Sequence, residues 1–533
     1  MIAGLGVFLW KMNDISREQA KKEAAVLKEE RDLVEEQDGK AIDNTKQVDI
    51  EPLYLSGNEK NVVTFSYGSV GEIYNPAKSA ATEETLTDIK KNKEFSFRDP
   101  LWSYNPYGTN SASMYVYFKS EGKCYCRYTV SVKSDQIPDF TRTLQGSATG
   151  ELTKEHEYQI PGLVQGMTNY IVLRLYNGDD ELSDVMIWQV DIPASPSGAE
   201  IQIQKEAGRS KTAISNGLYT VFMDGKRGSD GRQHNMILQY DNSGILRTEI
   251  PLNGYVGRNM QTVYDNLVYE CAENQVTKIN ALGQVLDTYN VNGYRLSGEY
   301  AYDGAGSLYL IATALGKNAT KNSKILKLEL VSGEVSVALD LDTLLPAVKK
   351  NAAKQSKSAE RNWIDLNSVQ VAGTNQLILS SRTLSSIFKV SNVSSLLPKV
   401  NYIIADQKLW SRYNNLKKKV LTKALPEGEE QEPTEEPVVK SILEPKKAAP
   451  ELFRSQYGQD ALYRTTGSLG EGQYYLEMLN NNAGAGAGNT GNSYYYRYLV
   501  DETTGTYILD DSRKLDKNTC NGNVTVTGKV IVY

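Results

Sequence analysis

Short apolar runs, alternating or β-branched and separated by Gly- or Asn-containing turns, cover most of the chain after residue 61. In the stretch 363–390, an apolar run precedes a turn at 373–375, and two more apolar runs follow it. This pattern predicts strands joined by tight turns. Asn367 begins the first predicted strand and Arg382 follows the second, so a hairpin would bring both to the same end of the sheet. An amide and a guanidinium placed together suit one bound anion.

Residues 61–197 show the same alternation, in segments such as NVVTFSYG, SMYVYFKS and NYIVLRLYN. Turn residues separate these segments at intervals typical of two packed sheets. We therefore expect a small antiparallel β-sandwich domain here. His156 precedes the strand predicted over 169–176, and we interpret it as a loop or structural histidine.

Residues 205–533 repeat one unit of strand, glycine turn and strand, as in NMILQYDNSGILRTEI and SKILKLELVSGEVSVALDL. Repeats of four short strands predict a β-propeller. Five blades are clear, and NGNVTVTGKVIVY begins a sixth, so the prediction is a six-bladed propeller whose last blade is incomplete in this chain. Either the chain is a fragment or another segment closes the ring. A helical excursion is expected over 345–362 and a charged loop over 424–450.

The N-terminus suggests a location outside the cytoplasm. Residues 1–12 carry an apolar run too short to span a bilayer, which we interpret as the remnant of a signal or anchor segment. A frayed apolar terminus is the alternative. Residues 13–60, rich in Glu, Lys and Ala, predict a helical stalk and linker. We expect an extracytoplasmic protein, secreted or anchored to the cell surface or membrane by this end.

Composition limits the chemistry. The net charge of −6 argues against a nucleic-acid partner. The four cysteines form no CxxC pair and have no histidine nearby in the sequence, which argues against zinc. We therefore expect no resident metal. Only two histidines are present, His156 and His234, and this count excludes any centre built from three imidazoles.

Four further stretches carry a family resemblance: HEYQIPGL, WIDLNSVQV with QLILSSRTLSSIFKV, PELFRSQYGQDAL, and GQYYLEMLNNN. In their co-linear order the chain resembles the bacterial arylsulfate sulfotransferases. The resemblance implies a six-bladed propeller behind a β-sandwich, in a homodimer. It implies transfer of a sulfuryl group from an aryl sulfate to a phenolic acceptor, without a nucleotide sulfate donor and without a cofactor. The implied partner is a small aromatic or sulfated ligand.

The functional residues of that family carry over only in part. Asn367 and Arg382 match the family's sulfate-binding pair. Asp460 stands where the family has its nucleophilic histidine, and Asp365 and Glu299 stand at two further histidine positions. A carboxylate is a poor substitute for a neutral imidazole that attacks sulfur.

Carboxylates at these positions would also repel an anionic donor. One unit charge at about 5 Å costs on the order of 3 kcal/mol at an effective dielectric near 20. Three such groups are expected to outweigh Arg382, so we expect transfer to be weak or lost.

Three hypotheses stay open. The first is a non-catalytic surface binding protein of this fold, the second is an enzyme with altered chemistry, and the third is a cation-binding propeller. In the third, Glu299, Asp365, Asp460 and the carbonyl oxygen of Asn367 offer oxygen ligands for calcium or magnesium, although Arg382 opposes a cation. Asp365 could also simply form a structural ion pair with Arg382.

Overall fold

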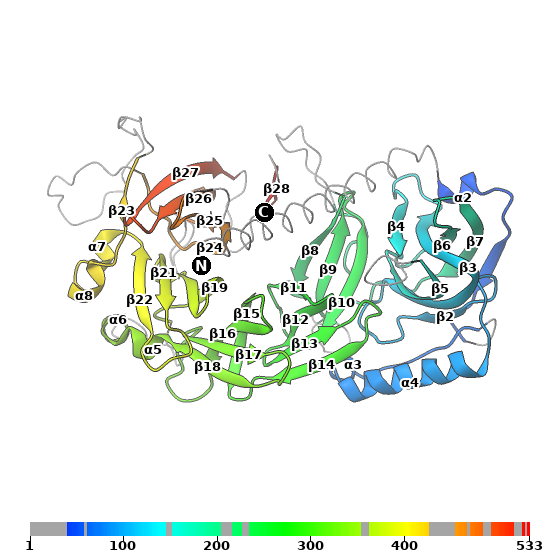
Figure 1. Cartoon of the computed structure of the whole chain (residues 1–533), viewed down its shortest axis with the longest axis horizontal. Coiled ribbons are helices and arrows are strands. Elements are labelled where there is room, and N and C mark those ends of the chain that lie inside the picture. The colour runs from blue at the N-terminus through cyan, green and yellow to red at the C-terminus, as the bar shows by residue number, and fades with distance from the viewer. Residues whose placement is uncertain are drawn as a thin grey trace, which may run out of the picture. The chain divides into compact units, whose positions relative to one another are not determined.

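The computed structural model consists mainly of small sheets, with few helices (Figure 1). It describes residues 40–57, 61–144, 152–203, 216–225, 234–352, 362–425, 453–465, 469–482, 492–515, 525–527 and 530–532. Two compact units divide the chain. Unit 1 holds residues 1–256, 262–272 and 276–288, and unit 2 holds residues 257–261, 273–275 and 289–533.

Unit 1 begins with the predicted sandwich. Its elements are α2 (Ala41–Asn44), β1 (Ile50–Leu53), α3 (Val70–Ile73), α4 (Pro76–Asn92), β2 (Leu101–Tyr104), β3 (Ser113–Val132), β4 (Phe140–Leu144), β5 (Thr153–Pro161), β6 (Thr168–Tyr176) and β7 (Leu182–Asp191). The long strand β3 organises them, because its first half pairs with β2 and β5 and its second half pairs with β4 and β6. β7 continues the sheet, and β1 joins β7 in parallel, which corrects the prediction of stalk and linker over 13–60 for this segment.

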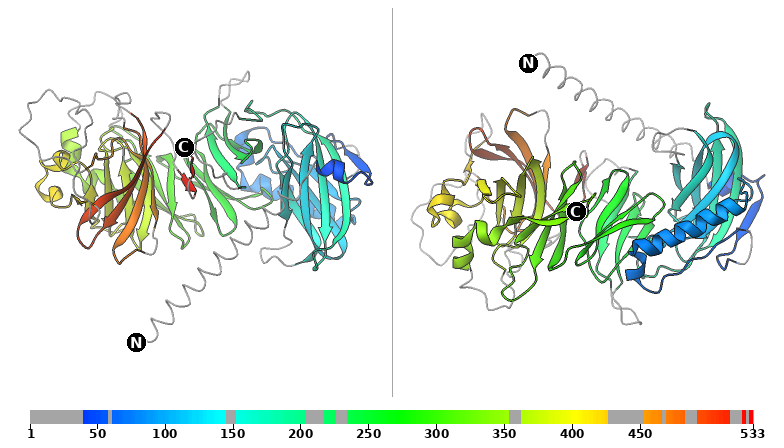
Figure 2. Two further views of the ribbon diagram at one scale, coloured as in Figure 1. Left: turned by 90° about the horizontal axis from the view of Figure 1, so that it is seen from above. Right: turned by 60° about the horizontal axis from the view of Figure 1, so that its bottom comes forward.

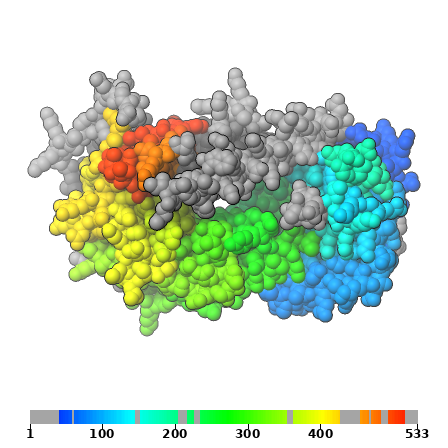
Figure 3. All heavy atoms as spheres, viewed as in Figure 1, coloured from blue at the N-terminus to red at the C-terminus, as the bar shows by residue number. Residues whose placement is uncertain are grey.

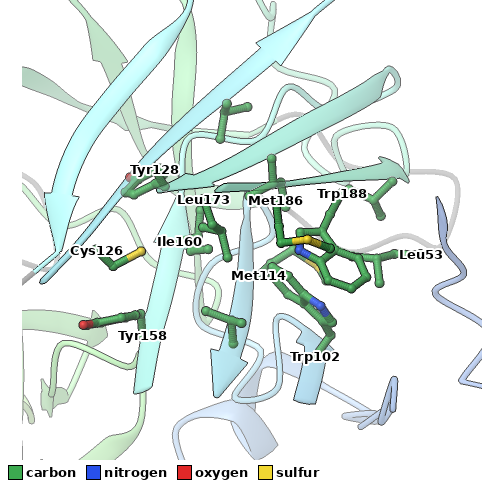
Figure 4. Packing of buried hydrophobic residues seen from close by; sticks show 14 of the residues in the cluster. Leu53, Trp102, Met114, Cys126, Tyr128, Tyr158, Ile160, Leu173, Met186 and Trp188 are labelled. Atoms are coloured by element: carbon green, nitrogen blue, oxygen red, sulfur yellow. The ribbon is translucent and has the colours of Figure 1, made fainter. Parts of the chain in front are cut away.

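The sandwich closes on an aromatic and aliphatic core. Trp102 of β2 and Trp188 of β7 meet edge to face at 5.6 Å, with Met114 and Met186 beside them (Figure 4). All four side chains are buried. Burial of large apolar surface of this kind is the main term that holds the two layers together.

Helix α4 corrects the all-strand prediction for this domain. Asn75 caps it by accepting a hydrogen bond from the Ala77 backbone, and Pro76 occupies its first position, where no donor is needed. Leu86 is fully buried and packs with Tyr115 and residues of β2 and β3. The helix runs along the outside of the sandwich (Figure 2), and its outer side is exposed on the face drawn in Figure 3. Its apolar positions were too sparse to predict it.

His156 is a structural residue, as expected, but it lies within strand β5 rather than in a loop. Its ring is fully buried and stacks on Phe118 at 4.6 Å. Nδ1 lies 2.7 Å from the Tyr158 hydroxyl, and Nε2 lies 3.0 Å from Ser120 Oγ and 3.3 Å from Cys124 Sγ. Burial lowers the pKa of His156 to about 4, so the ring is neutral at physiological pH.

The remaining sheets have the form of propeller blades. Their strands are β8 (Leu218–Met223), β9 (Asn235–Asp241), β10 (Leu246–Leu252), β11 (Met260–Val263), β12 (Asn266–Ala272), β13 (Gln275–Ile279), β14 (Val285–Asn290), β15 (Tyr294–Tyr302), β16 (Ser307–Ala314), β17 (Lys324–Glu329), β18 (Val335–Asp340), β19 (Leu366–Gly373), β20 (Gln376–Ser381), β21 (Ser386–Ser391), β22 (Lys399–Ile404), β23 (Thr422–Lys423), β24 (Asp460–Thr465), β25 (Gln473–Asn480), β26 (Tyr494–Asp501), β27 (Thr506–Lys514), β28 (Thr525–Thr527) and β29 (Val530–Val532). Short helices α5 (Leu341–Leu344), α6 (Pro346–Ala352), α7 (Gln407–Trp410) and α8 (Asn414–Lys417) connect some of them.

The predicted blade count needs correction. The described residues form five blade-like sheets, namely β8–β10, β11–β14, β15–β18, β19–β22, and β24–β27 with β23 added in parallel. Where a sixth blade was expected to begin, β28 and β29 form a two-stranded sheet. The helical excursion is confirmed over 346–352 by α6. The predicted anchor and most of the predicted stalk lie outside the described residues, in 1–39. Most of the predicted charged loop also lies outside them, in 426–452.

No helix of the described residues is long and apolar enough to cross a membrane.

In unit 2, a local pattern of burial fixes the start of β19. Trp363, Ile364 and Leu366 are all buried in one apolar cluster with β16 and β20–β22. The Trp363 indole also donates a hydrogen bond to Asp342 at 2.8 Å. Asp365 lies between these anchors with a left-handed backbone (φ +44°), a conformation that Asp tolerates better than most residues. The chain is therefore held firmly on both sides of Asp365.

Candidate functional site

A small polar cavity of about 160 Å³ in unit 2 gathers most of the residues singled out in the sequence. Glu299, Asp365, Asn367 and Arg382 all line it. Asp460 does not line it, but its carboxylate contacts Arg382, which does. The five residues come from three successive sheets, and the first strands of these sheets, β15, β19 and β24, are neighbours (Figure 1).

Each of these three strands breaks its regular pairing at the candidate residue. The register of β15 shifts between Leu296 and Tyr300, which brackets Glu299. The register of β19 shifts between Leu366 and Ser368, at Asn367, and that of β24 shifts directly after Asp460. Irregularities of this kind re-aim side chains and are common beside functional sites.

Asp365 is the more thoroughly satisfied of the two aspartates. Its Oδ2 accepts from Lys321 Nζ at 3.0 Å, and its Oδ1 accepts from Asn322 Nδ2 at 2.9 Å. The backbone carbonyl of Asp365 also accepts from the Arg382 amide at 3.1 Å, which ties the two ends of the β19–β20 hairpin together. The carboxylate of Asp365 is therefore held by Lys321 and Asn322, while its backbone is tied to Arg382.

Arg382 pairs instead with Asp460. Arg382 Nη2 lies 3.3 Å from Asp460 Oδ2, and Arg258 Nη1 lies 4.0 Å from the same oxygen. Asp460 Oδ1 accepts from the Ala461 amide at 3.0 Å. Burial raises the pKa of Asp460 and outweighs the lowering by the two arginines, while the nearby charge of Asp365 raises it further. Burial thus disfavours the ionised form of Asp460 by more than the two arginines favour it.

Asn367 is almost completely buried and is oriented by the chain just before Asp460. Its Nδ2 donates to the Gln459 carbonyl at 2.6 Å. Gln459 is in turn held by Ser380 Oγ and by the carbonyls of Ser381 and Ser386. Among the described residues, the Asn367 Oδ1 atom has no hydrogen-bond partner. One N–H of the Asn367 amide is thus committed to the protein.

The charge balance of the cavity corrects the expectation from the sequence. Besides Arg382, the basic residues Arg258, Arg295 and Lys321 line it. Four cations therefore face two carboxylates, or three when Asp460 is counted, so the acidic groups do not outweigh the basic ones. No pattern in the sequence marks these three additional cations, since a Lys or Arg near a turn is ordinary on a protein surface.

This arrangement of charges is unfavourable for binding a metal cation. Asp365 and Asp460 are both engaged by Lys or Arg side chains. Within the part of the chain that the structure describes, no cluster of three or more His, Cys, Asp or Glu side chains could hold a metal ion. The geometry favours an anion over the calcium or magnesium hypothesis.

Comparison with known families decides the relationship. The family model described as arylsulfotransferase (ASST) matches residues 204–512, more than half of the chain. The chain belongs to the arylsulfotransferase family. The model of the arylsulfotransferase Ig-like domain also matches, over residues 101–187 in the sandwich. No curated protein matches the chain.

Solved structures add only distant likenesses to this arylsulfotransferase-family chain. A hypothetical selenium-binding protein from Sulfolobus tokodaii is 7% identical, with a TM-score of 0.32, and the match covers 74% of this chain and 92% of that one. An auxiliary nutrient binding protein from Bacteroides ovatus is 8% identical, with a TM-score of 0.30 and coverage of 72% and 79%. Likenesses this weak carry no argument about function.

The arylsulfotransferase match contains every residue of the site, from Arg258 to Asp460. Neither histidine of the chain belongs to unit 2, which holds the cavity. His156 is enclosed in the sandwich core, and His234 lies just before β9. The cavity of this family member is therefore built without an imidazole.

Proposed function

We propose that this arylsulfotransferase-family protein binds the anionic group of an aryl sulfate in the small cavity, and that it transfers the sulfuryl group weakly or not at all. The guanidinium of Arg382 and the remaining N–H of Asn367 hold the sulfate oxygens. A guanidinium fork matches this group, because it presents parallel donors to oxygens that spread the negative charge.

The observation that carries this proposal is a cationic cavity that contains no histidine. Four basic side chains line it, which supports binding of an anion. Aspartates occupy two of the positions where the resemblance places histidines, and both are paired with cations. A carboxylate that attacked sulfur would form a reactive acyl-sulfate anhydride, whereas the family reaction passes through an imidazole.

A binding experiment tests the first half of the proposal. Titration of the purified protein with 4-methylumbelliferyl sulfate should give saturable binding. Arg382→Gln should weaken it roughly 10- to 100-fold, since a hydrogen bond to a charged group contributes about 1.5–3 kcal/mol. Arg412→Gln, which removes an exposed arginine between α7 and α8, is the matched control and should bind as the unaltered protein does. Absence of saturable binding would overturn the proposal.

An activity assay with a phenolic acceptor tests the second half. The unaltered protein should give little or no transfer, whereas the double variant Asp365→His with Asp460→His should gain it. Histidine tolerates the left-handed backbone at position 365, and two arginines beside position 460 favour a neutral imidazole. Sustained turnover by the unaltered protein, lost in Arg382→Gln, would instead establish an enzyme with altered chemistry.

Secretion, surface anchoring through the N-terminus and homodimer formation remain predictions that accompany this proposal.

A further inference from the structure

A second, larger cavity of about 590 Å³ in unit 2 has two lining residues in common with the small one, Arg258 and Glu299. Its other walls include Tyr302 and Leu462, so it offers apolar and aromatic surface. Arg258 stands out because neither the sequence pattern nor the family resemblance pointed to it. It lies in the segment 257–261, which belongs to unit 2 and leads into β11.

The backbone of β15 places Arg258. The Arg258 amide donates to the Gly298 carbonyl at 3.2 Å, within the irregular part of β15. Gly298 has φ +96°, a conformation that other residues rarely adopt. A Cβ atom at position 298 would lie 2.8 Å from Arg258 Cγ and 3.0 Å from its backbone nitrogen. Glycine is therefore the residue that lets the two backbones approach this closely.

The guanidinium of Arg258 has donors to spare. Its one charged partner among the described residues is Asp460, at 4.0 Å, and it makes no hydrogen bond with any of them. The side chain is 43% exposed and contributes to the walls of both cavities. An arginine carries five N–H donors, so these donors are available to a ligand.

We propose that Arg258 is a second anion-binding guanidinium of this site, and that Gly298 is the residue that positions it. Arg258 and Arg382 bind one sulfate group from two sides, both next to Asp460. The organic part of a sulfate ester then continues past Arg258 into the larger cavity. This inference rests on the proposed function, since it assigns a further residue to the same anion.

Substitution of Arg258 tests the role of its charge. Arg258→Gln should weaken binding of inorganic sulfate and of 4-methylumbelliferyl sulfate by a similar factor, roughly tenfold or more. Binding of 4-methylumbelliferone, which has no sulfate, should stay as it is. Arg258→Lys should restore part of the affinity, and Arg412→Gln should change nothing. Circular dichroism and the melting temperature of each variant would establish that it is folded.

Substitution of Gly298 tests the positioning, since Arg258 itself remains. Gly298→Ala should weaken sulfate binding, because the added Cβ displaces Arg258. Gly304→Ala is the matched control: it also has a positive φ (+77°), but its Cβ would meet nothing within 4 Å. It should bind sulfate normally.

The outcomes separate the two proposals. If Arg258→Gln binds sulfate as tightly as the unaltered protein while Arg382→Gln does not, the role of Arg258 is refuted and the proposed function stands. If neither substitution changes sulfate affinity, the proposed function fails with it. Normal binding by Gly298→Ala alongside weak binding by Arg258→Gln would refute the positioning role of Gly298.

Discussion

Asp460 lies within 4.0 Å of both arginines that we propose to bind the anion, so removal of its carboxylate tests the electrostatics of the site. Asp460→Asn keeps the shape of the side chain and an oxygen to accept from the Ala461 amide. It removes the charge that lies 3.3 Å from Arg382 and 4.0 Å from Arg258. Neither guanidinium then shares its charge with a carboxylate at position 460. We expect the variant to bind aryl sulfate more tightly than the unaltered protein.

The size of the effect follows from the geometry. A sulfate oxygen on Arg382 lies about 2.9 Å from the guanidinium nitrogen, on the side away from Asp460. The two negative groups are then about 6 Å apart, and their repulsion is about 3 kcal/mol at an effective dielectric near 20. Removing it should strengthen binding roughly 100-fold. Acidification should reduce the difference in affinity between Asp460→Asn and the unaltered protein, because protonation of Asp460, whose pKa is raised, removes the same charge.

Fluorescence titration with 4-methylumbelliferyl sulfate at several pH values measures both effects. Glu334→Gln removes one negative charge from the exposed turn between β17 and β18 and serves as the charge-matched control. A gain of less than about threefold for Asp460→Asn at neutral pH would contradict this account of the site. So would a gain of the same size in the control, since it would then reflect net charge rather than position.

Three further predictions concern stability. Because burial lowers the pKa of His156 from 6.5 to about 4, the unfolding free energy should fall by about 3 kcal/mol as the pH drops through that interval. Urea titrations at a series of pH values should show this fall, and His156→Gln should remove it. Because folding raises the pKa of Asp460, the contribution of this group to stability is complete below pH 3.8 and is lost as the pH rises through the raised pKa. Asp460→Asn should therefore increase the melting temperature at pH 7 but not near pH 3. Gly162→Ala should lower the unfolding free energy measured in urea by about 3 kcal/mol, since φ is +100° and the new Cβ would lie 2.3 Å from Phe140. Gly198→Ala, where φ is +68° and the Cβ would meet nothing within 4 Å, should lower it by less than half as much.

The parts of the site that sequence could predict are those that depend on neighbours along the chain. The β19–β20 hairpin is local, with a turn before Gln376, and its register pairs Leu366 with Ser381. That register brings Asn367 and Arg382 to one end, as the alternation of apolar residues indicated. The general class of fold follows from the same local signals, because each blade is a short meander whose turns carry Gly or Asn.

What sequence could not supply are contacts between distant segments. Arg258 reaches Asp460 across about 200 positions, and Lys321 reaches Asp365 across 44. Sequence alone therefore assigns only the acidic residues and Arg382 to the cavity. Helix α4 cannot be predicted from its sequence for a related reason, since its buried face is defined only by the sheet against which it packs.

The pairing irregularities suggest how a cavity without histidines could still bind the proposed anion. Glu299, Asn367 and Asp460 each lie at a register shift in a neighbouring strand, so the backbone sets where these side chains stand, whatever their chemistry. Replacing an imidazole by a carboxylate at such a point changes the charge and leaves the geometry. The new charge then needs a cation, and Lys321 for Asp365 and Arg382 with Arg258 for Asp460 supply it. Under the proposed function, such a site binds a sulfate but lacks the histidine nucleophile that the resemblance implies for the family reaction, which is why binding and transfer should be measured separately.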